Sequence, residues 1–491
     1  MNAKDPVLRV GQTCWRMGRA ERVAVIVDAA DYFATVRAAV LKAQHSVMMI
    51  GWDFDTRIAL LPGQKGLEGP NRLGRFLSWV VKTRPDLRVY VLRWDLGVVM
   101  ELKRGSTPLF VLNWMTSRRM RLVLDHVHPP MAAHHQKIIT IDDTLAFCGG
   151  IDMTADRWDT RSHRDDEPYR VRPTSRRRYK PWHDVATAVE GEVAKALGEL
   201  ARSRWERATG ERLDPPPPLE GAWPEGLQTT FTDVDVAIAR TVPDHEGHTG
   251  AREIEALYLA AIARCRRTLY IESQYFASRR IADAMAARLS EPDPPEIVVI
   301  NPESADGWLQ EEVMGSSRAR LLQLVRRADH KGRFRIYTPV TKGGQPIYVH
   351  AKVLVMDDRL LRVGSSNLNN RSMGFDSECD LALEAGADDV DLRGQIVGVR
   401  DDLLAEHLGV DEARLRAALD QGSLIAAIEV LRGEGRTLVP FDPPDLNGFE
   451  EEVMAENALL DPESTAAPRR SLRGWIRGLW SWRKRSPPLR P

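Results

Sequence analysis

One short pattern occurs twice in this chain: a histidine, a lysine two residues later and an aspartate five residues after the lysine. The two copies are His135, Lys137 and Asp142, and His350, Lys352 and Asp357. Each copy leads at the same distance into small residues, which are Gly149-Gly150 and Gly364-Ser365-Ser366. Two copies in matching contexts indicate an internal duplication, so we expect one active site built from two half-sites.

The sequence around the motifs supports this duplication. Asp214 and the run Pro215 to Pro218 cannot continue a helix and predict an extended linker near the middle of the chain. On either side, residues 30–54 and 254–276 have the same pattern, an amphipathic helix that leads into a buried strand. Further helix and strand patterns follow in both parts. We therefore predict an N-terminal half at 1–213, a linker at 214–218, a C-terminal half at 219–440 and a tail at 441–491.

The fold class follows from this alternation. Helices that alternate with strongly apolar strands predict an α/β fold, in which helices cover mixed or parallel sheets. Two α/β/α/β/α halves fused face to face would be related by a pseudo-twofold axis, with the two motif strands close to it. Helical patterns at 392–408 and 411–431 are expected to close the second half.

The residue types of the motif suit phosphodiester chemistry. On a strand, a histidine and a lysine two residues apart point to the same face. A neutral imidazole can attack phosphorus to form a phosphohistidine, and a second histidine, as imidazolium, can protonate the leaving oxygen. The two lysines would neutralise the phosphoryl oxygens. This chemistry requires no metal and no cofactor, so none is expected.

Other residues near the motifs are candidates for supporting roles. Asp142 and Asp357 complete the two motifs and are predicted as catalytic residues, at the strand ends where Asp-Asp pairs make turns. The small residues Gly149, Gly150 and Ser365 would let backbone N–H groups approach an anion. Asn367 can donate to a phosphate oxygen, and Asp152, at the equivalent place, is expected to orient Lys137 or a substrate group. Asp184 and Glu378 begin matching downstream strands and are candidate acceptors for the second ring nitrogen of each histidine.

With these residues in view, the chain resembles the phospholipase D superfamily over nearly all of residues 20–440. The resemblance is carried by AHHQKIITID, GGIDMTADRWDT, PWHDV, IESQYF, IYVHAKVLVMDD and GSSNLNNRSMGFDSE. It is strongest to phosphatidylcholine-cleaving phospholipases D and their bacterial relatives. The resemblance implies two phospholipase D-like halves, His135 as nucleophile, His350 as general acid and base, and Lys137 and Lys352 on the phosphate.

The sequence departs from the family pattern at a few positions. Ala351 stands where a serine is common, Asp156 replaces a glycine before Arg157, and Ser273 replaces an asparagine. No lipid-binding regulatory domain is expected before the core. These departures leave the predicted catalytic residues in place and bear on headgroup choice and regulation.

Composition and charge limit the partners and the cellular compartment that the sequence predicts. Lys+Arg and Asp+Glu number 69 each, so no global field favours nucleic acid, and no nucleic-acid partner is expected. Cys14, Cys148, Cys265 and Cys379 form no disulfide or metal-finger spacing. The N-terminus lacks a signal-peptide pattern, and no apolar stretch approaches the roughly 18 residues that span a bilayer. We predict a cytoplasmic, monomeric protein in a reducing compartment.

Several features allow two interpretations. Asp125, His126 and His128 form either a metal cluster or, as we favour, a turn before the motif strand. His163, His183 and the basic run Arg176 to Arg178 lie in a segment of the first half that the second half lacks, and the basic run is either a solvated face or a contact for anionic headgroups. Trp52, Trp94 and Trp158 pack in the core by default, with a lipid-contacting rim as the alternative.

The C-terminal tail is strongly basic. Residues 469–491 contain eight basic residues and no acidic one. Leu472, Trp475, Ile476, Leu479 and Trp480 fall at helical spacing, which is typical of a helix that lies on an anionic bilayer. Gly474 and Gly478 weaken that helix, and the alternative is a disordered basic tail. The tail therefore predicts peripheral contact with the inner face of a membrane.

The expected function is hydrolysis or headgroup exchange of a glycerophospholipid through a phosphohistidine. Three alternatives use the same observations. A cardiolipin-synthase-type phosphatidyltransferase would use the same residues with a lipid alcohol as acceptor. A nuclease of the superfamily is disfavoured by the zero net charge. A silent membrane-binding scaffold would require a damaged motif, and both motifs are intact.

Overall fold

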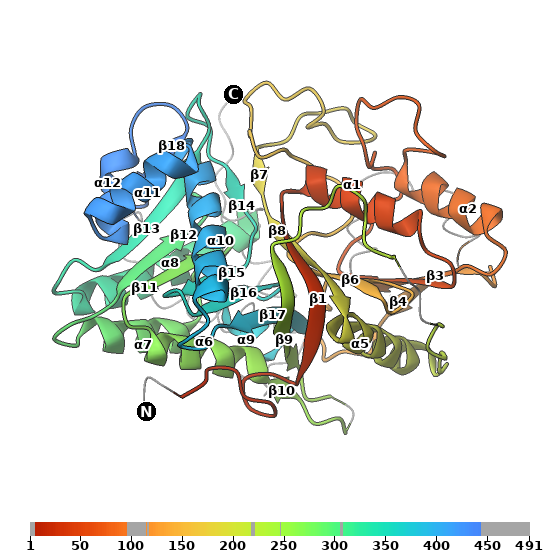
Figure 1. Cartoon of the computed structure of the whole chain (residues 1–491), viewed down its shortest axis with the longest axis horizontal. Coiled ribbons are helices and arrows are strands. Elements are labelled where there is room, and N and C mark those ends of the chain that lie inside the picture. Colours follow the sequence, from red (N-terminus) through yellow and green to blue (C-terminus); the bar gives the residue numbers. More distant parts are fainter. Residues whose placement is uncertain are drawn as a thin grey trace, which may run out of the picture.

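The computed structural model describes residues 5–95, 114, 117–217, 221–245, 247–304 and 308–442. The predicted membrane-binding tail at 469–491 lies outside these residues. Figure 1 shows two lobes of helices and strands that meet along the central strands β1 and β9.

The first half of the chain forms the lobe on the right of Figure 1. Its strands are β1 (Arg16–Val27), β2 (Ser46–Gly51), β3 (Arg88–Trp94), β4 (Met120–Asp125), β5 (Ile138–Ile141), β6 (Leu145–Gly149), β7 (Trp182–His183) and β8 (Val185–Gly191). Its helices are α1 (Ala29–Val40), α2 (Leu73–Thr83) and α5 (Glu192–Thr209).

The second half repeats this plan and adds to it. Its strands are β9 (Phe231–Val242), β10 (Ala251–Arg252), β11 (Thr268–Glu272), β12 (Glu296–Ile300), β13 (Phe334–Val340), β14 (Tyr348–Val349), β15 (Val353–Met356), β16 (Leu360–Gly364), β17 (Glu378–Glu384) and β18 (Thr437–Pro440). Its helices are α6 (Glu253–Arg264), α7 (Arg279–Leu289), α8 (Trp308–Ala328), α9 (Asn370–Gly374), α10 (Val390–Leu408), α11 (Glu412–Gln421) and α12 (Leu424–Leu431).

Most of these strands form a single 16-stranded sheet that runs through both lobes, in the order β18-β13-β12-β11-β15-β16-β17-β9-β1-β8-β6-β5-β2-β3-β4, with β10 paired to β9. Reading outward from the β9–β1 junction, the strands of the first half match β9, β17, β16, β15, β11, β12 and β13 of the second, which adds β18 and β10. At the junction β1 and β9 are antiparallel, with Gly18 opposite Val236. An antiparallel contact between equivalent strands is what a twofold relation produces. The predicted α/β class and the pseudo-twofold relation of the halves are confirmed.

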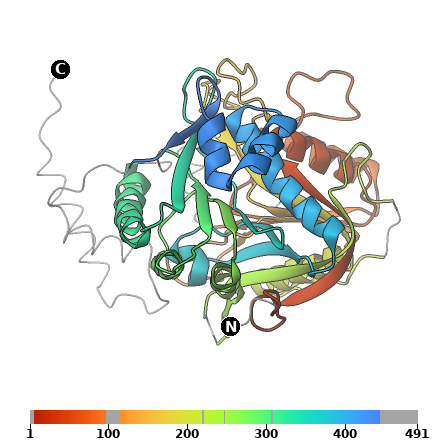
Figure 2. The same cartoon turned by 60° about the vertical axis from the view of Figure 1, so that its left-hand side comes forward.

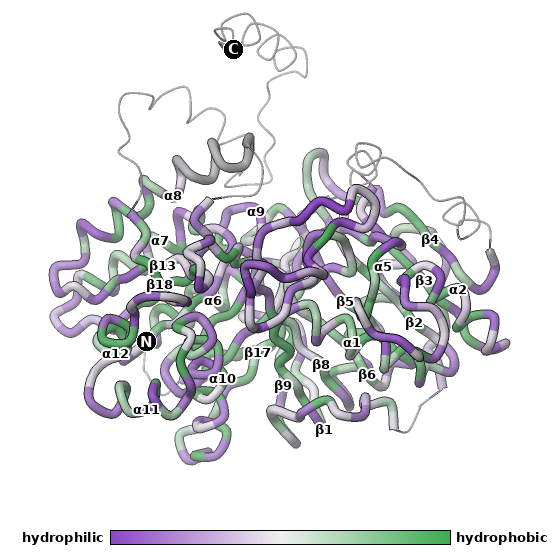
Figure 3. Tube along the Cα trace, turned by 90° about the horizontal axis from the view of Figure 1, so that it is seen from above, coloured by the Kyte–Doolittle hydropathy of each residue, from purple (hydrophilic) through white to green (hydrophobic). Residues whose placement is uncertain are grey.

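The sheet is buried because helices cover both of its faces. In α2, the apolar side chains Leu73, Phe76, Leu77, Val80 and Val81 recur at helical spacing and pack into the core of the first half. In β12, every residue of Glu296–Ile300 is buried, as expected for a strand covered on both sides. Figure 2 shows α10–α12 on one side of the second-half strands and α6–α8 on the other. Figure 3 shows hydrophobic colour along the central strands and hydrophilic colour in the outer loops.

The pattern at 411–431 forms two helices instead of one continuous helix. The first, α11, ends at Gln421, and Gly422 follows in an extended conformation. The hydroxyl of Ser423 then accepts a hydrogen bond from the backbone N–H of Ala426 and caps α12. Among the described residues, none of the helices combines the length and the apolar character needed to cross a membrane.

Candidate active site

The two motifs reach the middle of the molecule through equivalent backbone contacts between the halves. The N–H of His135 donates to the carbonyl of Ser377 at 2.9 Å, and the N–H of His350 donates to the carbonyl of His183 at 2.8 Å. The short strands β7 and β14 pair in parallel beside the second of these contacts. Each histidine is thus held by a strand end of the opposite half, which places both near the pseudo-twofold axis.

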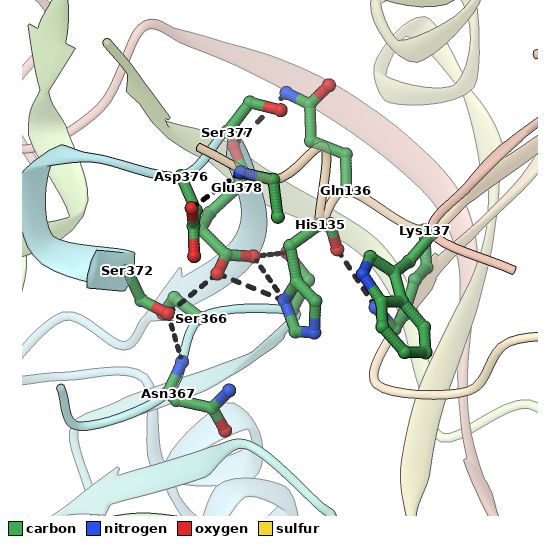
Figure 4. A network of polar contacts seen from close by, with 12 residues as sticks. His135, Gln136, Lys137, Ser366, Asn367, Ser372, Asp376, Ser377 and Glu378 are labelled. Atoms are coloured by element: carbon green, nitrogen blue, oxygen red, sulfur yellow. Dashed lines mark hydrogen bonds and ion pairs between the residues drawn. The ribbon is translucent and has the colours of Figure 1, made fainter. Parts of the chain in front are cut away.

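The imidazole of His135 is fixed by Glu378 (Figure 4). Its Nδ1 lies 3.0 Å from both carboxylate oxygens of Glu378. That carboxylate also accepts hydrogen bonds from the hydroxyls of Ser365 at 2.5 Å and Ser372 at 2.7 Å. With Nδ1 bonded in this way, Nε2 of His135 carries the lone pair and is free to act as a nucleophile.

His350 is fixed in the same manner by Asp184. Its Nδ1 lies 2.7 Å from Oδ2 of Asp184, whose Oδ1 accepts the N–H of Val185 at 2.9 Å. The side chain of Asp184 fits because residue 150 is glycine. A Cβ at Gly150 would lie 2.1 Å from Oδ1 of Asp184, so any larger residue would displace the carboxylate.

Each histidine is therefore oriented by an acid from the other half of the chain. His135 of the first half is bonded to Glu378, and His350 of the second half is bonded to Asp184. Among the described residues, neither motif histidine has its Nδ1 paired with a carboxylate of its own half. The halves must be in register with each other before either histidine is positioned.

The two lysines lie beside the histidines of their own motifs. Nζ of Lys137 donates to the carbonyl of His135 at 3.0 Å and lies 3.2 Å from Oδ2 of Asp152. Nζ of Lys352 donates to the carbonyl of His350. The contact between Lys137 and Asp152 agrees with the expectation that Asp152 orients this lysine. The arrangement places two cations next to two imidazoles, which suits an anionic group between them.

Burial and like charge shape the ionisation of this group. Burial, followed by the charges of Lys137 and Lys352, holds the pKa of His135 well below its usual value. Burial and Lys352 likewise lower the pKa of His350. Burial raises the pKa of Glu378 to about 8 and that of Asp184 to about 7. The lowered pKa of His135 keeps its imidazole neutral, which is the form that can attack phosphorus.

Asp142 and Asp357, which we expected among the catalytic residues, instead anchor the backbone. The carboxylate of Asp142 accepts the N–H groups of Gln44, His45 and Ser46 at 2.7, 2.8 and 2.6 Å. Asp357 accepts those of residues 266–268 at 2.9, 2.7 and 2.9 Å. Both lie at the end of the motif strand away from the histidine and lysine. They tie that strand to its neighbour and do not contact the candidate reacting groups.

Replacing Asp142 with alanine is therefore expected to act on stability. Three backbone N–H groups would lose their acceptor, which should lower the free energy of unfolding by about 3 kcal/mol. Urea denaturation measures this change. Asp283→Ala, which removes an exposed ion pair with Arg279, is the matched control and should cost less than about 0.5 kcal/mol. A loss of activity by Asp142→Ala at unchanged stability would contradict the anchoring role.

The small residues after the motifs also differ from the expectation. The N–H of Gly150 donates to the carbonyl of Val185, and the N–H of Ser365 donates to Cys379 and Asp380. A Cβ at Gly149 would lie 2.3 Å from Cα of Ala186. These residues allow close packing of β6, β8 and β17, and the N–H groups of Gly150 and Ser365 are already bonded within the protein. Asn367 differs, because its buried Oδ1 has no hydrogen-bond partner among the described residues, and its side chain lies near His135 in Figure 4.

The sequence interpretation missed a third cation near His350. Arg157 lies 4.1 Å from the ring centre of Trp182, and that ring stacks on Tyr348 at 4.5 Å. Trp182 also lies 5.1 Å from the imidazole of His350. The charge of Arg157 contributes to the lowered pKa of His350. The sequence held a signal, since Arg157 and Trp182 belong to the motifs DRWDT and PWHDV, but it did not show that they meet.

The residues that allowed two interpretations have defined contacts. Asp125 pairs with Arg204 and His134, whereas His128 pairs with Asp95, so within the described part of the chain they share no group of metal donors. Trp52 and Trp94 stack at 5.9 Å, and Trp158 packs partly buried against the first-half core. Arg176, Arg177 and Arg178 are exposed, which suits either interpretation of that run.

Comparisons with known proteins agree with this architecture. The family model described as Phospholipase D matches residues 39–215, and the model described as Cardiolipin synthase, PLD-like domain, matches residues 258–390. Phospholipase D alpha 1 of Vigna unguiculata is 22% identical over 512 residues, and that of Carica papaya is 24% identical over 513; each alignment covers 76% of this chain and 63% of the relative. Phospholipase D A of Dictyostelium discoideum is 22% identical, over 74% of this chain and 32% of the relative.

A solved structure shows the same fold. The crystal structure of phosphatidylserine synthase from Haemophilus influenzae superposes with a TM-score of 0.50 at 11% identity, over 79% of this chain and 87% of that one. The chain spans less than two thirds of the length of the phospholipases D alpha 1 that it matches. The two family models lie one in each half and each includes one motif histidine. The chain belongs to the phospholipase D superfamily.

Proposed function

We propose that this chain is a phospholipase D-type phosphodiesterase and transphosphatidylase that acts on glycerophospholipids. The observation that carries the proposal is the pair of histidines, each with Nδ1 bonded to a carboxylate and flanked by a lysine. The family supports a phospholipid as the substrate class. We further propose that His135, Lys137, His350 and Lys352 contact the phosphate and that Glu378 and Asp184 position the histidines.

The reaction follows from this geometry in two displacements. Nε2 of neutral His135 attacks phosphorus, and the bond between phosphorus and the headgroup oxygen breaks as that oxygen takes a proton from Nε2 of His350. This proton belongs to the Asp184–His350 pair, in which burial raises the pKa of Asp184 to about 7, so that the acid can hold the proton on Nδ1 of His350 while Nε2–H is donated. His350 then takes a proton from water or an alcohol, whose oxygen attacks phosphorus and releases His135. Lys137, Lys352 and Arg157 stabilise the charge on the phosphoryl oxygens. We assign His135 as the nucleophile because its side chain retains 15% of its exposure, against 5% for His350.

The first test is incubation of the pure protein with mixed phospholipid vesicles and a primary alcohol, with products identified by mass spectrometry. Formation of a phosphatidylalcohol would establish both a lipid substrate and a covalent phosphatidyl-enzyme. If a second lipid consumes the phosphatidyl group in preference to water and the alcohol, the phosphatidyltransferase alternative would replace hydrolysis. If no lipid is consumed by the folded protein, the proposal fails and other phosphodiesters, nucleic acid first, become the candidates.

The loss of activity at alkaline pH should follow the deprotonation of Lys352. Burial lowers the pKa of its ammonium group to about 7. Since only the charged form stabilises a phosphate, kcat/KM should fall as the pH rises through about 7, whereas kcat should fall at higher pH because bound phosphodiester favours the charged lysine. On the acid side the rate should fall only well below pH 6.5, where His135 becomes protonated. A Lys352→Arg variant cannot lose its charge, so an unchanged alkaline limb in this variant would assign that limb to another group.

We also propose that residues 469–491 hold the protein on anionic membranes. Their eight basic residues, together with Trp475 and Trp480, suit an interfacial helix. Removing residues 469–491 should weaken cosedimentation with phosphatidylglycerol vesicles about 10-fold or more, and the remaining binding should fall less steeply with salt. Phosphatidylcholine vesicles provide the control. Equal sedimentation of both proteins would show that the tail is not a membrane anchor.

A further inference from the structure

A second buried cluster of histidines and carboxylates lies behind the candidate active site. It consists of Asp28, His163, His183 and Glu406, all of which are buried. These residues come from four separate segments: the N-terminus of α1, the loop between β6 and β7, the strand β7 and the helix α10. One atom from each lies within 4.8 Å of the others. No step of the proposed reaction uses them.

The outer nitrogens of both histidines are already bound to carboxylates. Nδ1 of His163 lies 3.0 Å from Oδ2 of Asp159, which is also paired with Arg170. Nε2 of His183 lies 2.9 Å from Oε2 of Glu272. A neutral histidine that donates its outer N–H to a carboxylate presents a lone pair on its inner nitrogen. This carboxylate–histidine arrangement is the one that supports histidine ligands in metal sites.

The inner atoms of the cluster face one another, and Glu406 is also paired with Arg161 at 2.5 Å and with Arg436 at 3.4 Å. Nε2 of His163 lies 3.2 Å from Oε1 of Glu406 and 3.3 Å from Oδ2 of Asp28. Nδ1 of His183 lies 3.2 Å from the same Oε1 and 3.3 Å from Oδ1 of Asp28. These separations exceed the roughly 2.7–2.9 Å of charge-assisted hydrogen bonds. The buried Oδ2 of Asp28 has no hydrogen-bond partner among the described residues, which is costly unless a cation is present.

The position of Asp28 adds to this argument. Asp28 precedes α1, where an aspartate normally caps the helix, but its side chain makes no cap hydrogen bond. Its backbone has φ 66° and ψ 154°, a region that non-glycine residues rarely occupy. The carboxylate is turned toward His163 and His183 instead. A strained residue that forgoes its cap is consistent with a carboxylate held in place for another ligand.

The nitrogen–oxygen separations in the cluster are close to those around a tetrahedral ion. Four donors at the Zn²⁺ distances of about 2.0–2.1 Å lie roughly 3.3–3.4 Å from one another. The four nitrogen–oxygen separations given above, which involve both oxygens of Asp28, are 3.2–3.3 Å, and one atom from each of the four residues lies within 4.8 Å of the others. Ca²⁺ and Mg²⁺ prefer six or more oxygen ligands, whereas two imidazole nitrogens with two carboxylates suit Zn²⁺ and its first-row neighbours. We propose that Asp28, His163, His183 and Glu406 bind one first-row transition-metal ion, with Zn²⁺ as the best fit.

The proposed ion would stabilise the position of active-site residues without contacting the substrate. The N–H of Asp184 donates to Oδ1 of Asp28 at 3.1 Å, and the N–H of Asp28 donates to the carbonyl of Asp184 at 2.8 Å. The carbonyl of His183 accepts the N–H of His350. An ion at this site would join three segments of the first half to α10 of the second. Its effect on His350 through Asp184 rests on the proposed function, but the metal site itself does not.

The metal content of the full-length protein tests the proposal directly. The protein is expressed with added Zn²⁺, desalted, and measured by inductively coupled plasma mass spectrometry. We expect one ion per chain in the natural sequence and a loss of most of that metal in His163→Ala and in the milder Asp28→Asn. His128→Gln, which changes a half-buried histidine outside the cluster, is the matched control and should retain the ion. Equal metal content in all four proteins would place the ion elsewhere and overturn the proposal.

A spectroscopic measurement keeps the test independent of variants that fold poorly. The natural protein is stripped with a chelator under mild denaturation, refolded, and titrated with Co²⁺. Uptake of one Co²⁺ with the visible absorption of a tetrahedral nitrogen and oxygen site would support the proposal, whether or not the protein turns over lipid. A natural protein that carries no transition metal and takes up no Co²⁺ would show that the two histidines are held by protons instead.

Discussion

Replacing His135 with alanine is expected to abolish turnover while leaving the fold intact. The variant removes the proposed nucleophile, and loss of a covalent nucleophile costs on the order of 10⁴-fold or more in kcat. His135 is the most exposed of the paired histidines and makes its side-chain contacts to Glu378, so the core packing should survive. Initial rates of headgroup release from vesicles measure the loss, and circular dichroism confirms the fold.

The control for this variant is His330→Ala, which changes an exposed histidine outside the site and should leave the rate unchanged. Retention of more than about a tenth of the natural activity by His135→Ala would contradict the assignment of the nucleophile, given the size of the expected loss. The reciprocal variant, His350→Ala, should then be tested for the same role.

The second large effect concerns the acids that orient the histidines across the two halves. Asp184→Asn and Glu378→Gln should each lower kcat by about 10²–10⁴-fold, because an amide favours the wrong imidazole tautomer. The two variants should fail at different steps. Glu378 serves the proposed nucleophile, so its variant should not form the covalent intermediate. Asp184 serves the proposed acid and base, so with a leaving group that needs no protonation its variant should form the intermediate and then fail to hydrolyse it.

A phosphatidyl ester of p-nitrophenol separates these steps, since this leaving group departs without protonation. Rapid quenching and intact-mass measurement should then find a phosphatidyl adduct on Asp184→Asn and none on Glu378→Gln. Tryptic mapping should place the adduct on His135. The opposite pattern, with an adduct on Glu378→Gln alone, would mean that the two histidines have exchanged roles.

Local sequence patterns predicted most of the elements of the fold. The helix and strand patterns at 30–54 and 254–276 became α1 with β2 and α6 with β11. These patterns succeed because burial on one or both faces imposes a period on neighbouring residues. The interruption between α11 and α12 was harder to predict, because it depends on one glycine and one serine cap. The exact boundaries of the two halves stay a prediction.

The sequence predicted the individual residues of the candidate site but not the contacts between them. The sequence named His135, His350, Asp184 and Glu378, but it could not say which acid meets which histidine. That pairing depends on the β1–β9 junction, which brings each acid to the histidine of the other half. Asp142 and Asp357 belong to the same motif, yet they face the opposite strand end. A motif shows which residues recur together, and it does not distinguish a reacting group from an anchor.

By itself, the sequence determined the duplication, the α/β class and the residues of the two motifs, because each depends on the spacing of residues that are close together in the sequence. The tertiary structure alone decided the exchange of carboxylates between the halves and the meeting of Asp28, His163, His183 and Glu406. These four residues lie up to 378 positions apart, from residue 28 to residue 406. No local pattern relates them, since their proximity arises from chain segments that meet when the two halves pack together.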